Sequence, residues 1–376
     1  MSGPGNGDTS LIISINRKCP RQRVREARGS RGMLRAYILS LMKDRRNSPA
    51  DKLVKGALLL LSWVYGSAVR LIDLAYRSGI RKVTAVPAPV VSVGNLTLGG
   101  TGKTPFAVFL ADHFLAGGKR PAILTRGYGG DENRMLKDEI AGVPVLAGQD
   151  RVKNALKAAS SGSDVLILDD GFQHRRIARD LDILMIDGVR PFGNGRLFPR
   201  GTLREPASAL ERADILVVTK CDMISEAEKD RITGRLRGAL PGKPLVLARH
   251  RPTFFSDATG AAYPPEHLSG RKVCLVSGIA DADYLAYIVE KLGAGIAARI
   301  DFGDHHRYSP RDIAEVRRVC GRSGAEAVIT TRKDQVKLRE LDIPDLEGRL
   351  YVLNVVIDII EGKEKLVAGL NSVVNG

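Results

Sequence analysis

One short segment constrains the fold of this chain more than any other. It is Gly99-Gly100-Thr101-Gly102-Lys103-Thr104, which directly follows the apolar run Val90-Val91-Ser92-Val93. A buried strand, a glycine-rich turn ending in Gly-Lys-Thr and a helix-forming stretch at 106–115 are typical of a phosphate-binding loop. The glycines let backbone N–H groups surround phosphate oxygens, Lys103 would reach the β- and γ-phosphates, and the Thr104 hydroxyl would help to hold Mg²⁺. The segment therefore predicts a protein that uses a nucleoside triphosphate.

The rest of the chain shows the pattern of an α/β protein. Continuous apolar runs separated by helical stretches predict buried parallel strands at 121–125, 143–146, 165–168, 181–186 and 215–218. We expect a P-loop NTPase-like, doubly wound parallel sheet, with ligands at the carboxyl ends of its strands. Residues 187–212 read as a long loop that is either functional or disordered, and 241–244 and 251–265 read as linkers. A second, smaller α/β unit begins near residue 272, with strands at 273–276, 327–330 and 350–356.

The formal charge of +16 is concentrated near the N-terminus. Residues 17–46 hold eleven Lys and Arg against Glu26 and Asp44, and Tyr37 is their only aromatic residue. Such a run favours a disordered basic extension at 1–50, and we expect no nucleic-acid partner. Met33 is an alternative start of the chain. We therefore expect three parts: the extension, a P-loop domain at 51–240 and a smaller domain at 241–376.

An apolar helix is expected at 53–76, between the basic extension and the phosphate-binding loop. Its uncharged run of 14 residues is shorter than the roughly 18–20 that a bilayer span requires. Trp63, Tyr65 and the flanking basic residues favour a helix that lies in a membrane interface, with a buried core helix as the alternative. The four cysteines form no Cys-x-x-Cys pair, which argues against structural zinc and fits a reducing cytoplasm.

Two further segments follow predicted strands and carry polar chemistry. Asp169-Asp170-Gly171-Phe172-Gln173-His174-Arg175 places two carboxylates where P-loop proteins hold Mg²⁺. Thr219-Lys220-Cys221-Asp222 has the form of a guanine-reading motif, so a P-loop GTPase with a regulatory or metal-chaperone role is the alternative function. The residue three before Gly171 is Leu168, so the Asp-x-x-Gly switch motif of GTPases is absent.

Taken together, the motifs resemble the tetraacyldisaccharide 4′-kinase family, from about Leu53 to the end of the chain. The resemblance is carried by Val93 to Pro105, Thr125-Arg126-Gly127-Tyr128-Gly129, Leu168 to Arg175, Gly195-Arg196-Leu197-Phe198-Pro199, Leu203-Arg204-Glu205-Pro206 and Phe302-Gly303-Asp304-His305. It implies an ATP- and Mg²⁺-dependent enzyme that phosphorylates the 4′-hydroxyl of a tetraacyldisaccharide 1-phosphate, a lipid A precursor. It also implies a place at the cytoplasmic face of the inner membrane of a Gram-negative bacterium, with this glycolipid and the membrane surface as partners and no obligate protein partner.

The same resemblance implies roles for individual residues. Gly99, Gly100, Thr101, Gly102, Lys103, Thr104 and Arg204 would bind the nucleotide, and Thr104, Asp169, Asp170 and Glu205 would lie at the metal. Asp131, in a Gly-Asp-Glu motif, would be the catalytic base, with His305 of the second domain as its partner and Lys103 as the third catalytic residue. The segment between the Arg-Gly-Tyr-Gly and Gly-Asp-Glu motifs is shorter here than the family pattern, and Asp138 is the alternative base.

Overall fold

A computed structural model describes residues 30–127, 130–339, 341 and 348–375. Twelve strands of this described part form one continuous sheet in the order β10-β9-β11-β12-β7-β6-β5-β1-β4-β2-β3, with β8 paired to β7 at its side. Every neighbouring pair along that order is parallel except β7 with β12. The α/β architecture and the parallel sheet are as the sequence predicts.

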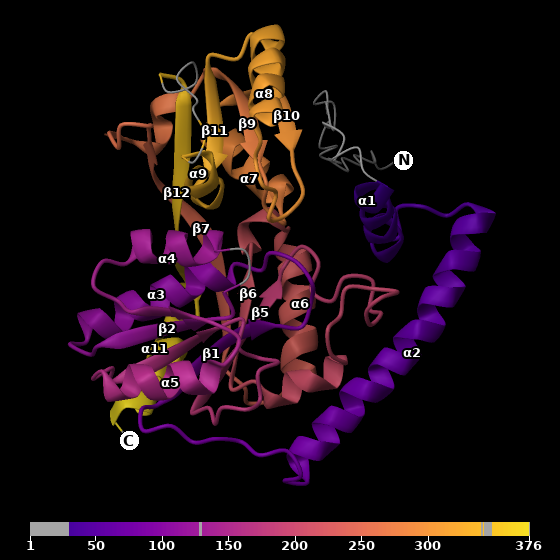
Figure 1. Ribbon diagram of the computed structural model, residues 1–376, viewed down its shortest axis with the longest axis vertical. Helices are drawn as coiled ribbons and strands as arrows, with labels where there is room; N and C mark the ends of the chain where they lie inside the picture. Colours follow the sequence, from indigo (N-terminus) through magenta and orange to yellow (C-terminus); the bar gives the residue numbers. More distant parts are fainter. Residues whose placement is uncertain (1–29, 128–129, 340, 342–347, 376) are drawn as a thin grey trace, which may run out of the picture.

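The sheet has two lobes (Figure 1), and each predicted apolar run overlaps one of its strands, whereas β7 and β10 were not among the predicted strands. The first lobe contains β1 (Val90–Asn95), β2 (Pro121–Thr125), β3 (Val145–Ala147), β4 (Val165–Asp169), β5 (Leu181–Asp187) and β6 (Ile215–Thr219). The second lobe contains β9 (Lys272–Ser277), β10 (Gly295–Asp301) and β11 (Ala327–Thr331), with the short β8 (Ala262–Tyr263) beside it. Two long strands, β7 (Leu245–Ser256) and β12 (Leu350–Glu361), run from one lobe into the other.

Helices cover both faces of the sheet. The first lobe is covered by α3 (Lys103–Ala116), α4 (Asp131–Glu139), α5 (Arg151–Ser160), α6 (Glu226–Ala239) and α11 (Lys363–Asn375), and the second by α7 (Ala282–Lys291), α8 (Pro310–Ser323) and α9 (Arg332–Leu338). Within the described residues, 3₁₀ turns lie at η1 (Ala207–Arg212), η2 (Cys221–Met223) and η3 (Pro265–Leu268). The C-terminal helix α11 belongs by sequence to the second half of the chain, yet Leu366 and Leu370 are fully buried in the core of the first lobe.

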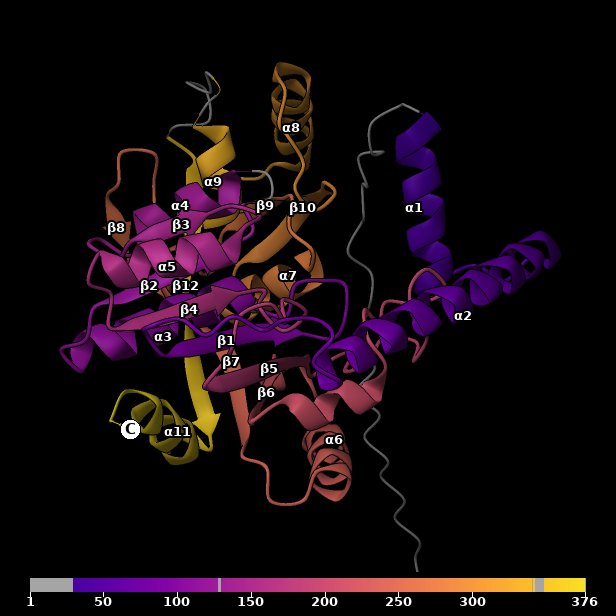
Figure 2. The same ribbon diagram turned by 60° about the horizontal axis from the view of Figure 1, so that its bottom comes forward.

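The N-terminal part of the described chain is a pair of helices that extends away from the body (Figures 1 and 2). They are α1 (Ser30–Met42) and α2 (Pro49–Arg77), and a capping box between Ser48 and Asp51 fixes the start of α2. Residues 30–42 of the basic extension are therefore helical rather than disordered, and Leu41 and Met42 are buried. Residues 1–29 lie outside the described part. The expected helix at 53–76 is present and longer than predicted.

One of the two expectations about irregular segments needs correction. Residues 251–265 read as a linker, but 251–256 belong to β7, where Pro252 lies beside a shift in the β7–β12 register. A proline has no N–H for the ladder and is tolerated at such an irregularity. The loop at 187–212 is present, and it contains η1 and packs against α2.

Candidate active site

The phosphate-binding loop joins β1 to α3 at the carboxyl edge of the sheet. Gly102 precedes Lys103 in the left-handed region with φ of 83°, and Gly99 has φ of 135°, conformations that side chains other than glycine rarely adopt. The N-terminus of α3, with its unpaired N–H groups, therefore faces the loop as an anion site. Two strands support the loop from behind: the Thr219 hydroxyl donates to Thr101 O at 3.1 Å, and the His250 ring packs against Gly102.

Lys103 lies in a cluster of charges around Asp170. Its Nζ is 3.5 Å from Asp170 Oδ1, and Arg204 Nη1 donates to both oxygens of that carboxylate at 2.8 and 3.0 Å. Burial disfavours the ionised carboxylate, but the positive charges of Lys103 and Arg204 outweigh it and lower the pKa of Asp170. Asp170 is therefore an anion that aligns two cations toward the loop, where phosphate oxygens would bind.

Thr104 and Asp169 meet at the end of β4. The Thr104 hydroxyl donates to Asp169 Oδ2 at 3.0 Å, as the helix after the loop and the strand beside β1 converge. Hydroxyl and carboxylate oxygens are the ligands that Mg²⁺ prefers, so Thr104, Asp169 and Asp170 fit this ion by chemistry. No group of three or more His, Cys, Asp or Glu side chains in the described part is arranged as a metal cluster.

Glu205 belongs to a hydrogen-bond network that leads to Arg204. Its carboxylate accepts hydrogen bonds from Arg212 Nη1 at 2.6 Å and from Gln173 Nε2 at 3.0 Å. Gln173 Oε1 in turn accepts from Arg204 Nη1 at 3.2 Å. Glu205 is thus placed with the predicted site residues through Gln173 and Arg204, and these contacts orient Arg204 toward Asp170.

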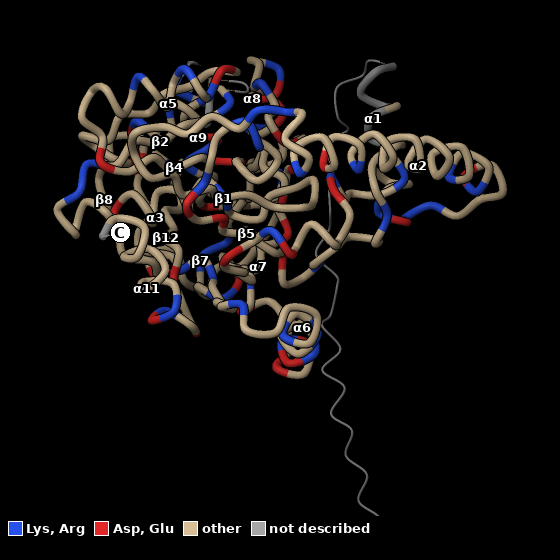
Figure 3. The backbone as a smooth tube through the Cα atoms, turned by 90° about the horizontal axis from the view of Figure 1, so that it is seen from below, with Lys and Arg blue, Asp and Glu red and all other residues tan. Residues whose placement is uncertain are grey.

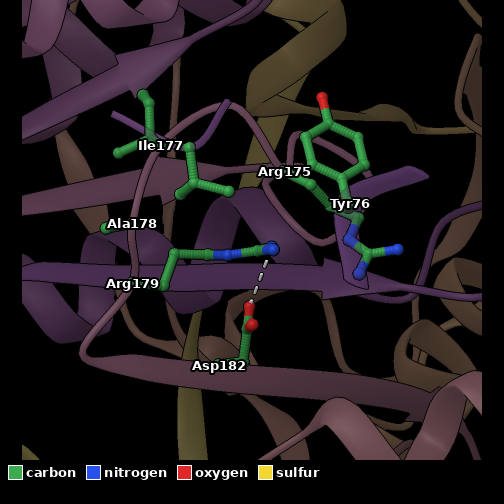
Figure 4. A pocket seen from close by; sticks show the side chains of 7 residues that line it. Tyr76, Arg175, Ile177, Ala178, Arg179 and Asp182 are labelled. Atoms are coloured by element: carbon green, nitrogen blue, oxygen red, sulfur yellow. Dashed lines mark hydrogen bonds and ion pairs between the residues drawn. The ribbon is translucent and has the colours of Figure 1, made fainter. Parts of the chain in front are cut away.

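The same network reaches the apolar helix α2. Asp73 of α2 forms an ion pair with Arg175, whose guanidinium lies 4.9 Å from the centre of the Tyr76 ring. Beside them is a cavity of about 260 Å³, shown in Figure 4, where Arg179 Nη1 is 3.3 Å from Asp182 Oδ1. Each arginine at this cavity is paired with a carboxylate, and the ion pair between Arg175 and Asp73 joins α2 to the body.

His305 follows β10 and faces a lysine from α9. Its Nε2 is 3.5 Å from Lys333 Nζ and 3.7 Å from Asp304 Oδ2. Asp131 is the first residue of α4, and its side chain lies outside what the structure describes. Asp138 lies at the other end of α4, where its Oδ2 is 3.7 Å from Arg339 Nη1. Both acids are therefore on the helix that contacts the second lobe, and the choice of base stays a prediction.

The guanine-reading motif is occupied by contacts within the protein. Lys220 is buried between Asp187, at 2.6 Å, and Asp281 of the second lobe. Asp222 Oδ1 accepts a hydrogen bond from the Tyr284 hydroxyl at 2.8 Å. The two side chains that would contact a guanine base instead join β6 to α7.

Two residues of the site were missed from the sequence. Arg151, the first residue of α5, is almost fully buried, and its Nη1 donates to Asp170 O at 3.1 Å. The signal was available, because Asp150-Arg151 follows the short strand β3 at the same carboxyl edge as the loop. Lys333 was also missed, and nothing in its surrounding sequence indicates that it meets His305.

The fold and the loop together define a P-loop nucleoside-triphosphate-binding protein. The family model described as "Tetraacyldisaccharide-1-P 4'-kinase" matches residues 54–133 and 129–375. The tetraacyldisaccharide 4'-kinase of Anaeromyxobacter dehalogenans is 38% identical over 86% of this chain and 92% of its own, and that of Pelobacter propionicus is 38% identical over 81% and 89%. The crystal structure of the Aquifex aeolicus enzyme in complex with ATP has 29% identity and a TM-score of 0.66, covering 85% of this chain and 99% of that one.

The chain belongs to the tetraacyldisaccharide-1-phosphate 4'-kinase family, and it is a kinase of lipid A biosynthesis. The family assignment agrees with the resemblance seen in the sequence motifs. It also sets aside the GTPase alternative, in line with the contacts that occupy Lys220 and Asp222.

Proposed function

We propose that this kinase transfers the γ-phosphoryl group of ATP to the 4′-hydroxyl of a tetraacyldisaccharide 1-phosphate. The observation that carries the proposal is the convergence of Lys103 and Arg204 on Asp170 beside the loop glycines. Their two positive charges are placed to stabilise the negative charge that develops on the phosphoryl oxygens. Mg²⁺, held by Thr104, Asp169 and Asp170 when bound, would supply further charge neutralisation, with Glu205 behind them.

Asp131 is proposed as the base that accepts the proton of the attacking hydroxyl, with His305 as its partner. The first residue of α4 and the loop after β10 belong to different lobes, and α4 contacts α9 of the second lobe. A base assembled from both lobes is complete only when the lobes are together. This arrangement favours transfer to the lipid hydroxyl over transfer to water, because water would be excluded from a closed site.

We further propose that α2 places the enzyme on the cytoplasmic face of the inner membrane. The helix is long and apolar enough to cross a bilayer, with mean hydropathy 1.5 over its most apolar window. Its outward side exposes Leu60, Leu61, Trp63 and Val64, and few charges lie along its middle (Figure 3). Its other side contacts the loop of Arg204: Ser62 Oγ donates to Leu197 O at 2.9 Å, and the Tyr65 hydroxyl donates to Arg204 O at 2.8 Å. A lipid held along α2 would therefore lie next to the catalytic cations.

The test is transfer of label from γ-labelled ATP to tetraacyldisaccharide 1-phosphate by the detergent-solubilised protein with Mg²⁺. Lys103→Ala should lower kcat by about 100-fold or more, because a charge-stabilising group is lost at the transferred phosphoryl group. Lys157→Ala, which removes an exposed lysine of α5, is the matched control and should transfer label like the wild type. Equal turnover by a folded Lys103→Ala variant would exclude the proposed role of the loop.

The base is tested separately in the same assay. Asp131→Ala should lower kcat far more than it changes the affinity for ATP, whereas Asp138→Ala should have a small effect. The opposite result would assign the base to Asp138. An arm with GTP in place of ATP tests the nucleotide, and efficient use of GTP would contradict the occupied state of Asp222.

A further inference from the structure

Two neighbouring residues at the start of α9 contact the two segments that carry the proposed base and its partner. Arg332 and Lys333 directly follow β11, and their side chains extend toward different elements. Lys333 reaches the loop of His305, and Arg332 reaches the last turn of α4, the helix that begins at Asp131. One short element of the second lobe is therefore bonded to both.

Lys333 fixes the backbone and the ring of His305. Its Nζ is 3.1 Å from Asp304 Oδ1, and the same oxygen accepts a hydrogen bond from His305 N at 3.1 Å. His305 has φ of 59°, a left-handed conformation that is strained for a residue other than glycine. The lysine thus holds the carboxylate that maintains this strained turn, and it contacts the imidazole at 3.5 Å as well.

Arg332 fixes α4 against the second lobe. Its Nη2 donates to Asp138 O at 3.1 Å, its Nε is 3.7 Å from Glu139 Oε1, and its Nη1 donates to Asn354 Oδ1 of β12 at 3.0 Å. Carbonyl oxygens in the last turn of a helix have no partner within the helix, so this contact supplies one from the other lobe. Arg332 therefore links α4 to the second lobe.

We propose that Lys333 is a positioning residue for phosphoryl transfer, acting through His305, while Arg332 positions the helix that carries the base. This inference rests on the proposed function, in which Asp131 is the catalytic base and His305 is its partner. In the proposed arrangement the Lys333 ammonium, 3.5 Å from Nε2, donates to the lone pair of that nitrogen, and the ring hydrogen of neutral His305 is then on Nδ1. Lys333 thereby sets the direction and the tautomer of the imidazole.

The kinetic test separates positioning from general stability. Lys333→Met should lower kcat by about 100-fold, the scale of a misplaced catalytic group, and should change the KM for ATP little. Lys333→Arg, which keeps the charge, should recover a large part of kcat. Lys363→Met, at the exposed start of α11, is the matched lysine control and should behave as wild type.

A double-mutant cycle shows whether Lys333 acts through His305. In a His305→Ala background, Lys333→Met should cause no further loss of kcat, because the group that it positions is gone. Arg332→Gln should remain additive with His305→Ala, because it acts through α4. A full additional loss from Lys333→Met, or a loss confined to the KM for ATP, would overturn the proposal.

A spectroscopic test does not depend on the substrate. In ¹⁵N-histidine-labelled protein, the His305 signals, assigned by their loss in His305→Ala, should report the Nδ1–H tautomer in the wild type. They should shift toward the Nε2–H tautomer in Lys333→Met. Unchanged signals would refute the contact, whereas a tautomer shift without any transfer to the lipid would contradict the proposed function alone.

Discussion

His250 is a buried histidine that the phosphate-binding loop rests upon. It lies on β7, and its backbone N–H donates to the Tyr284 hydroxyl at 3.0 Å. Burial and the nearby Lys220 ammonium lower its pKa to about 4. The neutral ring can therefore pack against Gly102 without placing a buried charge beneath the loop.

This environment predicts a dependence of stability on pH. The folded-state pKa of about 4 lies below the unfolded value of 6.5, so the unfolded state takes up a proton first as the pH falls. His250 should thus lower the free energy of unfolding as the pH falls from about 6.5 to about 4, by at most about 1.4 kcal/mol per pH unit. His250→Gln should make this decrease shallower in urea titrations at pH 7, 6 and 5. A variant with the wild-type slope would show that the pKa of His250 does not differ between the folded and unfolded states.

Gly94 shows how closely the two catalytic segments approach. A Cβ on this residue of β1 would lie 2.3 Å from Phe172 Cβ and 2.7 Å from Phe172 N. Gly94→Ala should therefore destabilise the fold by about 1–3 kcal/mol, because neither atom is the end of a flexible side chain. Gly234→Ala is the control: Gly234 lies within α6 with open space around it, so helix propensity should stabilise the protein by up to about 1 kcal/mol. Chemical unfolding of the wild type, Gly94→Ala and Gly234→Ala measures the expected loss and the expected gain in the free energy of unfolding.

Only part of the site was predictable from single residues in the sequence. Lys103, Thr104, Asp169 and Asp170 could be found because each follows a strand and lies within a few residues of a recognisable motif. The contact of Glu205 with Gln173 and that of Lys333 with His305 join segments that are 32 and 28 residues apart. Their meeting depends on how loops fold back at the sheet edge, which local patterns do not encode.

At the scale of elements, continuous apolar runs located the parallel strands of the first lobe, because strands buried on both faces have a near-uniform composition. The strand β7 was not predicted, and its second half was read as a linker for the opposite reason. It carries Arg249, Arg251 and Pro252 and pairs antiparallel with β12 where the two lobes meet. Its exposure alternates there, and a proline and polar residues in a short window resemble a linker more than a strand.

The helix α2 carries a prediction about membranes. Leu60 and Trp63 are 59% and 64% exposed, so Leu60→Glu/Trp63→Glu should leave the melting temperature nearly unchanged. Binding to phospholipid vesicles should fall sharply in co-sedimentation, because two apolar anchors are replaced by charges. Leu156→Glu, at an exposed leucine of α5, is the control and should still bind. Undiminished binding of the double variant would argue against α2 as the membrane contact.

At the scale of the molecule, the two lobes share one sheet, and the C-terminal helix packs on the first lobe. The strands β7 and β12 pair over nine positions and run from one lobe into the other. The sheet is therefore continuous between the lobes. The helix α11 then returns to cover the first lobe, where Gly369 is so close to Ile215 that a Cβ would lie 2.9 Å from its Cδ1. The predicted division at residue 240 therefore separates two lobes that are connected by both backbone pairing and core packing.

This connection predicts that the lobes unfold together. Leu366→Ala, in α11, should destabilise the protein by about 2–5 kcal/mol because it leaves a cavity in the first-lobe core, and Leu285→Ala, in the second-lobe core, should cost a similar amount. Both variants should shift one common urea transition, followed by circular dichroism and by hydrogen exchange in β1 and β9. If each variant instead moved a separate transition, with exchange rising in β1 alone or in β9 alone, the lobes would be independent folding units. A single transition would mean that the lobe with the strained turn of His305 and the lobe with the phosphate-binding loop unfold as one cooperative unit.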